Sequence, residues 1–147
     1  MTPTPVFFDT NVLVYIFSVD EPAKLRIAEQ LYGSATSDGT ATVSTQVIQE
    51  FYAATTRRPH RRLSPREARH VAQELAELNV IQLGVPLLLR AMDLNRSDHI
   101  SFWDALIVEA ALAGGCRTLY SEDLQHGRSF GPLRVVNPFV PETNSAR

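Results

Sequence analysis

The sequence predicts an α/β domain whose parallel sheet is covered by helices on both faces. Short apolar runs of strand length alternate along the chain with longer segments whose apolar residues recur at helical spacing. Strands that are separated by helices pair in parallel, and a parallel sheet is buried on both faces. The chain has 147 residues, which is the length of one domain and enough to bury a sizeable core.

Four short apolar segments are predicted strands, and a further candidate near the C-terminus gives a sheet of four to five strands. The first segment ends at an acidic residue, Asp9, and the third is closed by Gly84. In chain order the segments are Val6–Phe8, Ala41–Ser44, Val80–Leu83, Arg117–Tyr120 and Leu133–Val136.

Helical patterns fill most of the chain between these strands. Pro22 and Pro86 suit the first position of a helix. The run from Ser64 to Glu67 has the N-cap, proline and acidic residues of a helix start. The expected helices cover Val12–Phe17, Pro22–Tyr32, Val47–Ala54, Ser64–Leu78, Val85–Leu94 and Ser101–Ala113. Two small polar segments, Ser34–Thr40 and Asn95–His99, are predicted connections.

The composition limits the class of protein. Hydrophobic residues make up 44% and charged residues 20%, as in an ordinary globular domain. No apolar run reaches the roughly 18 residues of a membrane span, and Met1–Pro5 has no basic region of a secretory signal. The single cysteine, Cys116, excludes an intrachain disulfide and a Cys-rich zinc site, and it is expected to be a buried thiol. We expect a cytosolic protein without a membrane partner, with one domain over residues 1–140 and a tail over 141–147.

Four acidic residues lie where a strand meets a helix or within the first turns of a helix: Asp9, Glu50, Asp104 and Asp123. Each has an ordinary explanation, as an N-cap, a surface residue, half of a capping box with Ser101, or a turn residue. Two of them resist it. Glu50 belongs to the side of its helix that carries the apolar residues, and Asp104 sits in a helix that is apolar nearly all round. Buried acids need a partner.

The predicted topology brings these acids to one edge of the sheet. Asp9 ends the first strand and Asp123 follows the fourth, and parallel strands end at the same edge. Glu50 is on the helix that leaves the second strand, while Asp104 is at the start of the helix that returns to the fourth. Ligands of open α/β sheets bind in the crevice at this carboxyl edge.

A divalent metal is the simplest way to hold such a cluster, since two carboxylates about 4 Å apart repel by roughly 4 kcal/mol at a protein surface. The ligand set is all oxygen, which favours Mg²⁺ or Mn²⁺, ions that are usually shared with substrate phosphates.

The net charge of −2 argues against a general nucleic-acid coat. A local basic patch exists, however, because six of the fourteen basic residues lie between Arg57 and Arg69. Phosphodiester chemistry is therefore expected.

Four segments of the chain resemble the PIN-domain ribonucleases, in the order and spacing of the VapC toxins of bacterial type II toxin–antitoxin modules. The segments are Val6–Leu13, Ser44–Glu50, Ser101–Ile107 and Ser121–Gln125. The S-F-W-D-A-L-I and S-E-D-L-Q sequences are far more specific than the opening D-T-N. The resemblance implies a three-layer α/β/α PIN-like fold and an endoribonuclease that depends on Mg²⁺ or Mn²⁺.

The resemblance also assigns roles to residues. Asp9, Glu50, Asp104 and Asp123 are the catalytic acids, with Asp9, Asp104 and Asp123 as metal ligands and Glu50 orienting the attacking water or holding a second ion. Asn11 and Ser44 are candidates for hydrogen bonds with the acids or waters. Many relatives carry a further acid shortly after the fourth, but here Gln125 and His126 occupy that stretch, which puts a second metal in doubt; Glu122 is a weak substitute.

The implied partners are an RNA substrate, a cognate antitoxin and a second copy of the chain in a homodimer. The apolar helices at Val12–Phe17 and Leu25–Tyr32 are candidates for the antitoxin surface, although ordinary core packing explains them equally well. Alternatives are a catalytically silent PIN-like interaction module, or a PIN nuclease of RNA processing rather than a toxin. A halo-acid phosphohydrolase is disfavoured because Asn11 stands where that family needs a second aspartate.

Overall fold

The computed structural model describes residues 3–141, which form one mixed sheet with helices around it. Within these residues the sheet has six strands in the order β3-β2-β1-β4-β6-β5. The strands are β1 (Val6–Phe8), β2 (Ala41–Ser44), β3 (Asn79–Ile81), β4 (Thr118–Tyr120), β5 (Ser129–Phe130) and β6 (Leu133–Val136). All neighbours pair in parallel except β5 and β6. The expected α/β fold with a mostly parallel central sheet is confirmed.

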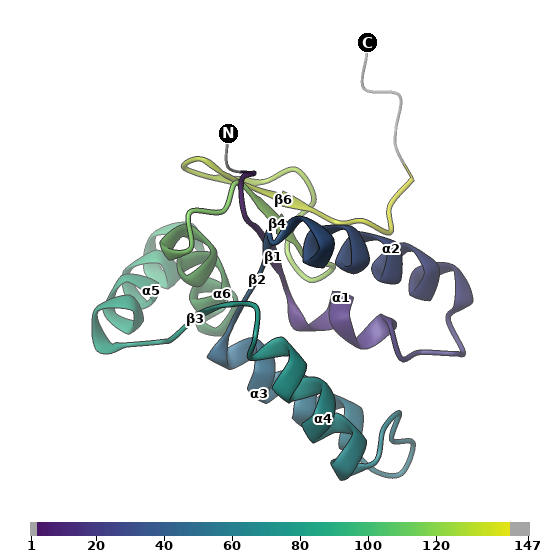
Figure 1. The fold of residues 1–147 in the computed structure, drawn as a ribbon. Coiled ribbons are helices and arrows are strands. Elements are labelled where there is room, and N and C mark those ends of the chain that lie inside the picture. The colour runs from purple at the N-terminus through teal and green to yellow at the C-terminus, as the bar shows by residue number, and fades with distance from the viewer. Residues whose placement is uncertain (1–2, 142–147) are drawn as a thin grey trace.

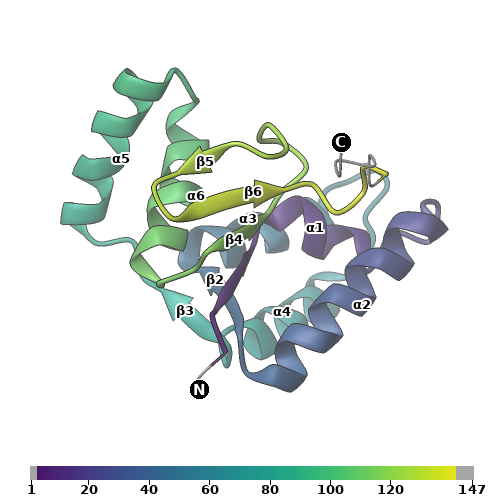
Figure 2. The same ribbon diagram turned by 90° about the horizontal axis from the view of Figure 1, so that it is seen from above.

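The helices cover both faces of this sheet. They are α1 (Thr10–Tyr15), α2 (Pro22–Asp38), α3 (Thr45–Thr56), α4 (Pro65–Leu75), α5 (Val85–Asp98) and α6 (Phe102–Ala113). Figure 1 shows α5 and α6 on one side of the strands and α1 and α2 on the other, and Figure 2 shows the same layers from above. The hairpin of α3 and α4 projects beyond the carboxyl end of β2.

Two predicted connections are helical, so these predictions were wrong. The segment from Ser34 continues α2 as far as Asp38 because Ala35 is buried against the core, and the helix ends at Gly39, whose φ of 72° is the left-handed conformation of a helix C-cap. In the same way α5 continues through the polar residues after Leu94 and ends at His99. Polar residues mark a connection poorly, because the exposed side of a helix has the same composition.

The sheet has one strand more than expected. The short β5 forms a hairpin with β6 through Gly131, whose φ is 57°. Two residues are too few to show an alternating pattern, which is why the sequence did not reveal this strand. The predicted third strand, Val80–Leu83, lies one to two residues earlier, at Asn79–Ile81.

The remaining elements follow the sequence closely. The helix start at Ser64 is a full capping box with Glu67, as predicted. Cys116 is buried, and burial raises the pKa of its thiol to about 11, so it is an inert core residue. In the described part of the chain no helix is long and apolar enough to cross a membrane. Of the predicted tail, residues 142–147 lie outside the described residues.

The register between neighbouring strands determines which residues lie side by side at the carboxyl edge of the sheet. β1 is central, between β2 and β4, and Phe8 pairs with Tyr120. The next residue of each strand, Asp9 and Ser121, therefore leaves the sheet side by side. The connections from β1 and β2 lead to helices, and the strand order reverses at β1, which is where ligands bind in such sheets.

Candidate active site

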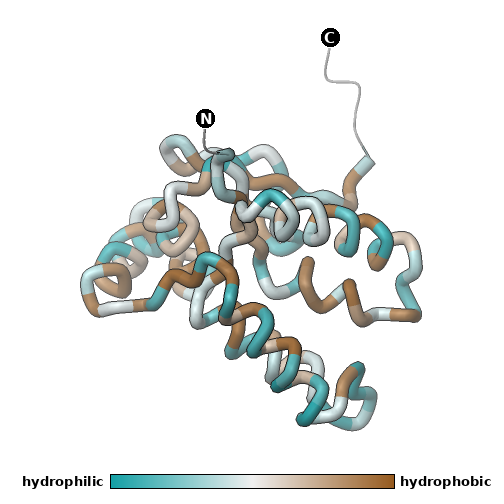
Figure 3. Tube along the Cα trace, viewed as in Figure 1, coloured by the Kyte–Doolittle hydropathy of each residue, from teal (hydrophilic) through white to brown (hydrophobic). Residues whose placement is uncertain are grey.

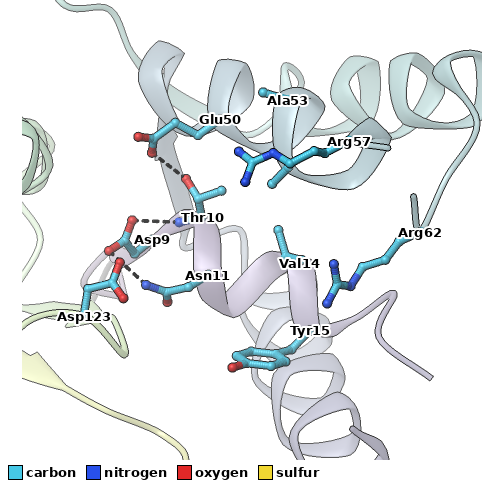
Figure 4. Close-up of a pocket in the computed structure, with 11 residues that line it drawn as sticks. Asp9, Thr10, Asn11, Val14, Tyr15, Glu50, Ala53, Arg57, Arg62 and Asp123 are labelled. Carbon is cyan, nitrogen blue, oxygen red and sulfur yellow. Dashed lines mark hydrogen bonds between the residues drawn. The ribbon is translucent and has the colours of Figure 1, made fainter. Parts of the chain in front are cut away.

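A pocket of about 420 Å³ opens at the carboxyl edge of β1, between α1 and α3. Three of the four predicted acids line it, namely Asp9, Glu50 and Asp123. Figure 4 shows Asp9 and Asp123 at one end and Glu50 reaching down from α3. The structure therefore brings together acids that are up to 114 positions apart in the chain, as the predicted topology required.

Asp9 is the centre of this site and is only 4% exposed. One carboxylate oxygen, Oδ1, accepts from the backbone amide of Thr10 at 2.8 Å, so Asp9 is indeed the N-cap of α1. The other oxygen, Oδ2, accepts from the hydroxyl of Ser121 at 2.7 Å and more weakly from Asn11 Nδ2 at 3.5 Å. The capping role and the site role thus use different oxygens of one side chain.

The carboxyl group of Asp9 binds its proton more tightly than an ordinary aspartate does. Burial raises the pKa of its carboxyl to about 7, although the bonds from Ser121 and Thr10 lower it. The negative charges of Asp123 and Glu50 raise the pKa further. Desolvation and like charges both disfavour the ionised form, and a bound cation would reverse that preference.

Glu50 is half-buried on α3, and both of its oxygens are held. Oε1 accepts from Thr10 Oγ at 2.9 Å and Oε2 accepts from Gln46 Nε2 at 3.4 Å. Gln46 also donates to the carbonyl of Trp103 at 3.3 Å, which links α3 to the start of α6. Glu50 is therefore fixed facing the pocket, as its position on the apolar side of the helix indicated.

Asp104 lies in the first turn of α6, outside the lining of the pocket. Its amide donates to Ser101 Oγ at 3.0 Å, but no bond from the amide of Ser101 to its carboxylate is present among the described residues, so the predicted capping box is only half formed. Burial raises the pKa of the Asp104 carboxyl, the nearby side chain of Ser101 lowers it, and the charge of Asp123 raises it. Exposed Asp123 thus lies close enough to raise the pKa of both Asp9 and Asp104.

Two arginines also line the pocket. They are Arg57, at the C-cap of α3, and Arg62, in the connection that follows. Figure 4 shows the guanidinium group of Arg62 beside Val14, away from Asp9 and Asp123, and that of Arg57 nearer to Thr10 and Glu50. The arginine-rich segment of the sequence therefore reaches the site with two of its members.

Three polar residues of the site were missed in the sequence, namely Thr10, Gln46 and Ser121. Ser121 is fully buried, and besides bonding Asp9 its hydroxyl oxygen accepts from the amide of Asp123 at 3.2 Å. One hydroxyl therefore fixes two of the acids. Its signal was the position directly after β4, which becomes informative only once β4 is known to lie beside β1.

Asn11 and Ser44, the two residues expected to hydrogen-bond the acids or waters, differ in their contacts. Asn11 bonds Asp9 weakly, and its Oδ1 accepts from the amide of Glu122 at 3.1 Å, so it ties α1 to the loop that carries Asp123. Ser44 is the N-cap of α3 and accepts from Val47 N at 3.3 Å; within the described residues it has no bond with the acids.

Glu122 is occupied elsewhere. Its carboxylate accepts from Lys24 Nζ and from Tyr15 Oη, each at 2.7 Å. Burial raises the pKa of Glu122, but these two bonds outweigh burial and lower it below its ordinary value. Glu122 therefore fastens the loop to α1 and α2 rather than replacing the missing acid.

The chemistry of the acids fits a divalent cation. They present only carboxylate oxygens, and buried Asp9 forms no ion pair with a basic side chain of the described residues. In residues 3–141, however, no three Asp, Glu, His or Cys side chains lie close enough together to hold one ion. Asp9 and Glu50 are instead linked through Thr10, whose amide donates to Asp9 and whose hydroxyl donates to Glu50.

Comparisons with known proteins place this geometry in a family. The family model described as "PIN domain" matches residues 6–128. No curated protein sequence matches significantly. Similar solved structures include a toxin–antitoxin complex from Klebsiella pneumoniae, with 18% identity, a TM-score of 0.66 and coverage of 91% of this chain and 98% of that one.

Two further structures share the fold at low identity. VapC20 from Mycobacterium tuberculosis, a toxin that cleaves the Sarcin-Ricin loop, is 21% identical with a TM-score of 0.62, covering 80% of this chain and 89% of that one. DNA-bound VapBC from Salmonella typhimurium is 14% identical with a TM-score of 0.63, covering 90% and 97%. The family model spans more than half of the sequence and the fold agrees, and the chain therefore belongs to the PIN-domain family.

Proposed function

We propose that this protein is a metal-dependent endoribonuclease and the toxin of a toxin–antitoxin pair. The observation that carries the proposal is the pocket itself, which is lined by three carboxylates and two arginines. Carboxylates alone would repel an RNA phosphate, whereas a divalent cation held by them would attract it. The family is one of nucleases, and the similar structures include toxin–antitoxin complexes.

Each side chain has a task in hydrolysis. Asp9, Asp104 and Asp123 would hold Mg²⁺ or Mn²⁺ partly through bound waters, because the three side chains are not close enough to contact one ion directly. The ion would supply a bound water of lowered pKa and screen phosphate charge. Glu50, fixed by Thr10 and Gln46, accepts a proton from the water that attacks phosphorus. Arg57 and Arg62 face the pocket as donors for the phosphate oxygens, whose charge increases as the bond to the leaving oxygen breaks.

The activity test uses Asp9→Asn and Asp104→Asn. We expect cleavage of a mixed RNA pool in Mn²⁺ to fall by about 10³-fold in each variant, because the lost charge acts on the transition state directly. Asp38→Asn, an exposed aspartate at the end of α2, is the matched control and keeps full activity. Undiminished cleavage in EDTA contradicts the proposal, and binding without any cleavage supports a silent interaction module instead.

The toxin role has its own test. Induced expression should arrest growth of a bacterial host, and co-expression of the product of the neighbouring open reading frame should restore it. Sequencing of RNA ends after induction identifies the substrate.

The two helices considered for the antitoxin surface turn most of their apolar residues to the core, including Val12, Leu13, Ala28 and Leu31. A partner would therefore contact their exposed residues. Light scattering tests the expected homodimer.

A further inference from the structure

Beside the catalytic pocket lies a second hollow, of about 550 Å³, that the proposed reaction leaves without a role. It is formed by the loop after α1 and by the connection between α3 and α4. Its apolar lining is Phe17, Val19 and Pro59, and its polar and charged lining is Asp20, His60, Arg61 and Arg62. Figure 3 shows the connection as a mostly hydrophilic stretch at the far end of the α3–α4 hairpin.

Arg62 joins this hollow to the catalytic pocket, because it lines both. Its position is fixed. Nε donates to Ser18 Oγ at 2.7 Å, and this fully buried serine in turn donates to the carbonyl of Val14 at 2.9 Å. A phosphate at Arg62 would therefore be shared between the two sites.

The connection that carries these arginines is also held in place. The amides of Arg62 and Leu63 both donate to the carbonyl of Thr55, at 2.9 and 3.0 Å, near the end of α3. Thr55 is fully buried, and its hydroxyl donates to the backbone carbonyl of Phe51 at 2.8 Å. The hollow is thus largely formed before a ligand arrives, which reduces the ordering that binding requires.

The charge around the hollow favours an anion. Among the described residues, Arg57, Arg58, Arg61 and Arg62 have no carboxylate within ion-pair distance. Asp20 is the acid in the lining. Glu67 is the nearby acid outside the lining. Its carboxylate accepts from the amide of Ser64, which lowers the pKa of Glu67, and the charge of Arg61 lowers this pKa as well.

The apolar lining favours a flat base over a simple ion. Val19 is 86% exposed, which leaves a large apolar side chain facing solvent next to Phe17 and Pro59. The volume is in the range of sites that enclose a small organic molecule. One nucleotide combines the two requirements, an anionic phosphate for the arginines and an apolar base face for the lining.

We infer that the hollow binds a nucleotide of single-stranded RNA that flanks the scissile phosphate. Its phosphate lies against Arg61 and Arg62, and its base packs on Val19, Phe17 and Pro59. The inference rests on the proposed ribonuclease activity. An acidic protein segment is the other polyanion that the arginines attract. The continuity with the catalytic pocket through Arg62 favours RNA.

The test measures binding without catalysis. A fluorescein-labelled 12-nucleotide RNA pool is titrated with the full chain in EDTA, and anisotropy is followed at several salt concentrations. The variants are Arg61→Gln and Val19→Glu, both at exposed positions. The matched control is Arg117→Gln, which removes the same charge at the amino end of β4, opposite the acids.

We expect Arg61→Gln to weaken binding about fivefold at 0.1 M salt and to reduce the salt slope by about 0.7, the contribution of one phosphate on a single strand. Val19→Glu should also weaken binding, while Arg117→Gln should match the wild type. The inference is wrong if both variants bind RNA as tightly as the wild type. It is wrong in that case even if both variants no longer bind an acidic protein partner, because the hollow then binds protein instead of RNA. If RNA binding depends on Arg61 but the protein cleaves no RNA in Mn²⁺, the nuclease proposal is wrong while the inference that the hollow binds RNA is retained.

Discussion

The two ends of the catalytic pocket hold charge in opposite ways. At the acidic end, Asp9 is buried, receives hydrogen bonds from Ser121 and Thr10, and forms no ion pair with a basic side chain of residues 3–141. At the basic end, Arg57 and Arg62 are exposed, and they extend into a connection that carries further arginines. The chain therefore fixes its acids at a cost in stability, whereas Arg57 and Arg62 keep their charges exposed, even though the Ser18 hydroxyl orients Arg62.

The largest expected effect concerns the stability of the acidic end. In the unfolded chain Asp9 has its ordinary pKa of 3.8, and in the folded protein its pKa is about 7. The folded state therefore binds the proton more tightly, so the free energy of unfolding falls as pH rises between these values and stays low above them. The difference of about three pKa units corresponds to roughly 4 kcal/mol.

Asp9→Asn removes this penalty and should stabilise the metal-free protein while it abolishes activity. We expect a gain of up to about 4 kcal/mol at pH 8 and less than half of that at pH 5, measured by urea unfolding in EDTA. The control, Asp38→Asn, should change stability by less than about 1 kcal/mol at either pH. A gain that does not grow with pH would show that Asp9 carries no such penalty.

The next effect concerns the hydroxyl that connects two acids. Ser121→Ala leaves the acids in the sequence but removes the bond to Asp9 and the acceptor for the amide of Asp123. We expect Mn²⁺ affinity and RNA cleavage to fall by about 10-fold to 100-fold, as for other residues that orient metal ligands. Ser37→Ala, at an exposed site on α2, should change neither. Unaltered metal affinity in Ser121→Ala would leave this serine with a packing role alone.

Metal binding itself should depend on pH. Because Asp9 must lose its proton to bind a cation, Mn²⁺ affinity should rise by up to about tenfold per pH unit below the pKa of about 7 and level off above it. Calorimetric titration from pH 6 to pH 8 measures this slope, and the melting temperature should rise with Mn²⁺ by mass action. An affinity that is flat over this range would exclude Asp9 as a ligand.

The smallest effect is expected at the basic end. Arg57→Gln removes one exposed cation from the pocket, and we expect RNA binding in EDTA to weaken about fivefold at 0.1 M salt, the contribution of one phosphate contact. Stability should be nearly unchanged, since no ion pair of the described structure is lost. Arg117→Gln serves again as the control. Equal affinity of Arg57→Gln and wild type would show that Arg57 contacts no phosphate and would leave Arg62 as the phosphate-binding arginine of the pocket.

Sequence patterns predicted most of the fold because hydrophobic spacing is a local property. The strands β1 and β2 and the helix starts at Ser64 and Ser101 lie where their apolar runs and caps indicated. The errors fell on polar residues. Ser34–Asp38 and Asn95–Asp98 form the ends of exposed helices, and such residues are equally common in loops.

The order of strands and helices along the chain is enough to predict that Asp9, Glu50 and Asp123 lie together, because each follows a strand of a parallel sheet and such strands end at one edge. The neutral residues that hold these acids depend on the packing of the folded chain. Ser121 bonds Asp9 because Phe8 and Tyr120 are in register, and Gln46 reaches Glu50 and Trp103 because α3 and α6 begin close together. Hydrogen-bond partners across strands depend on register and helix position, which no spacing within one segment records.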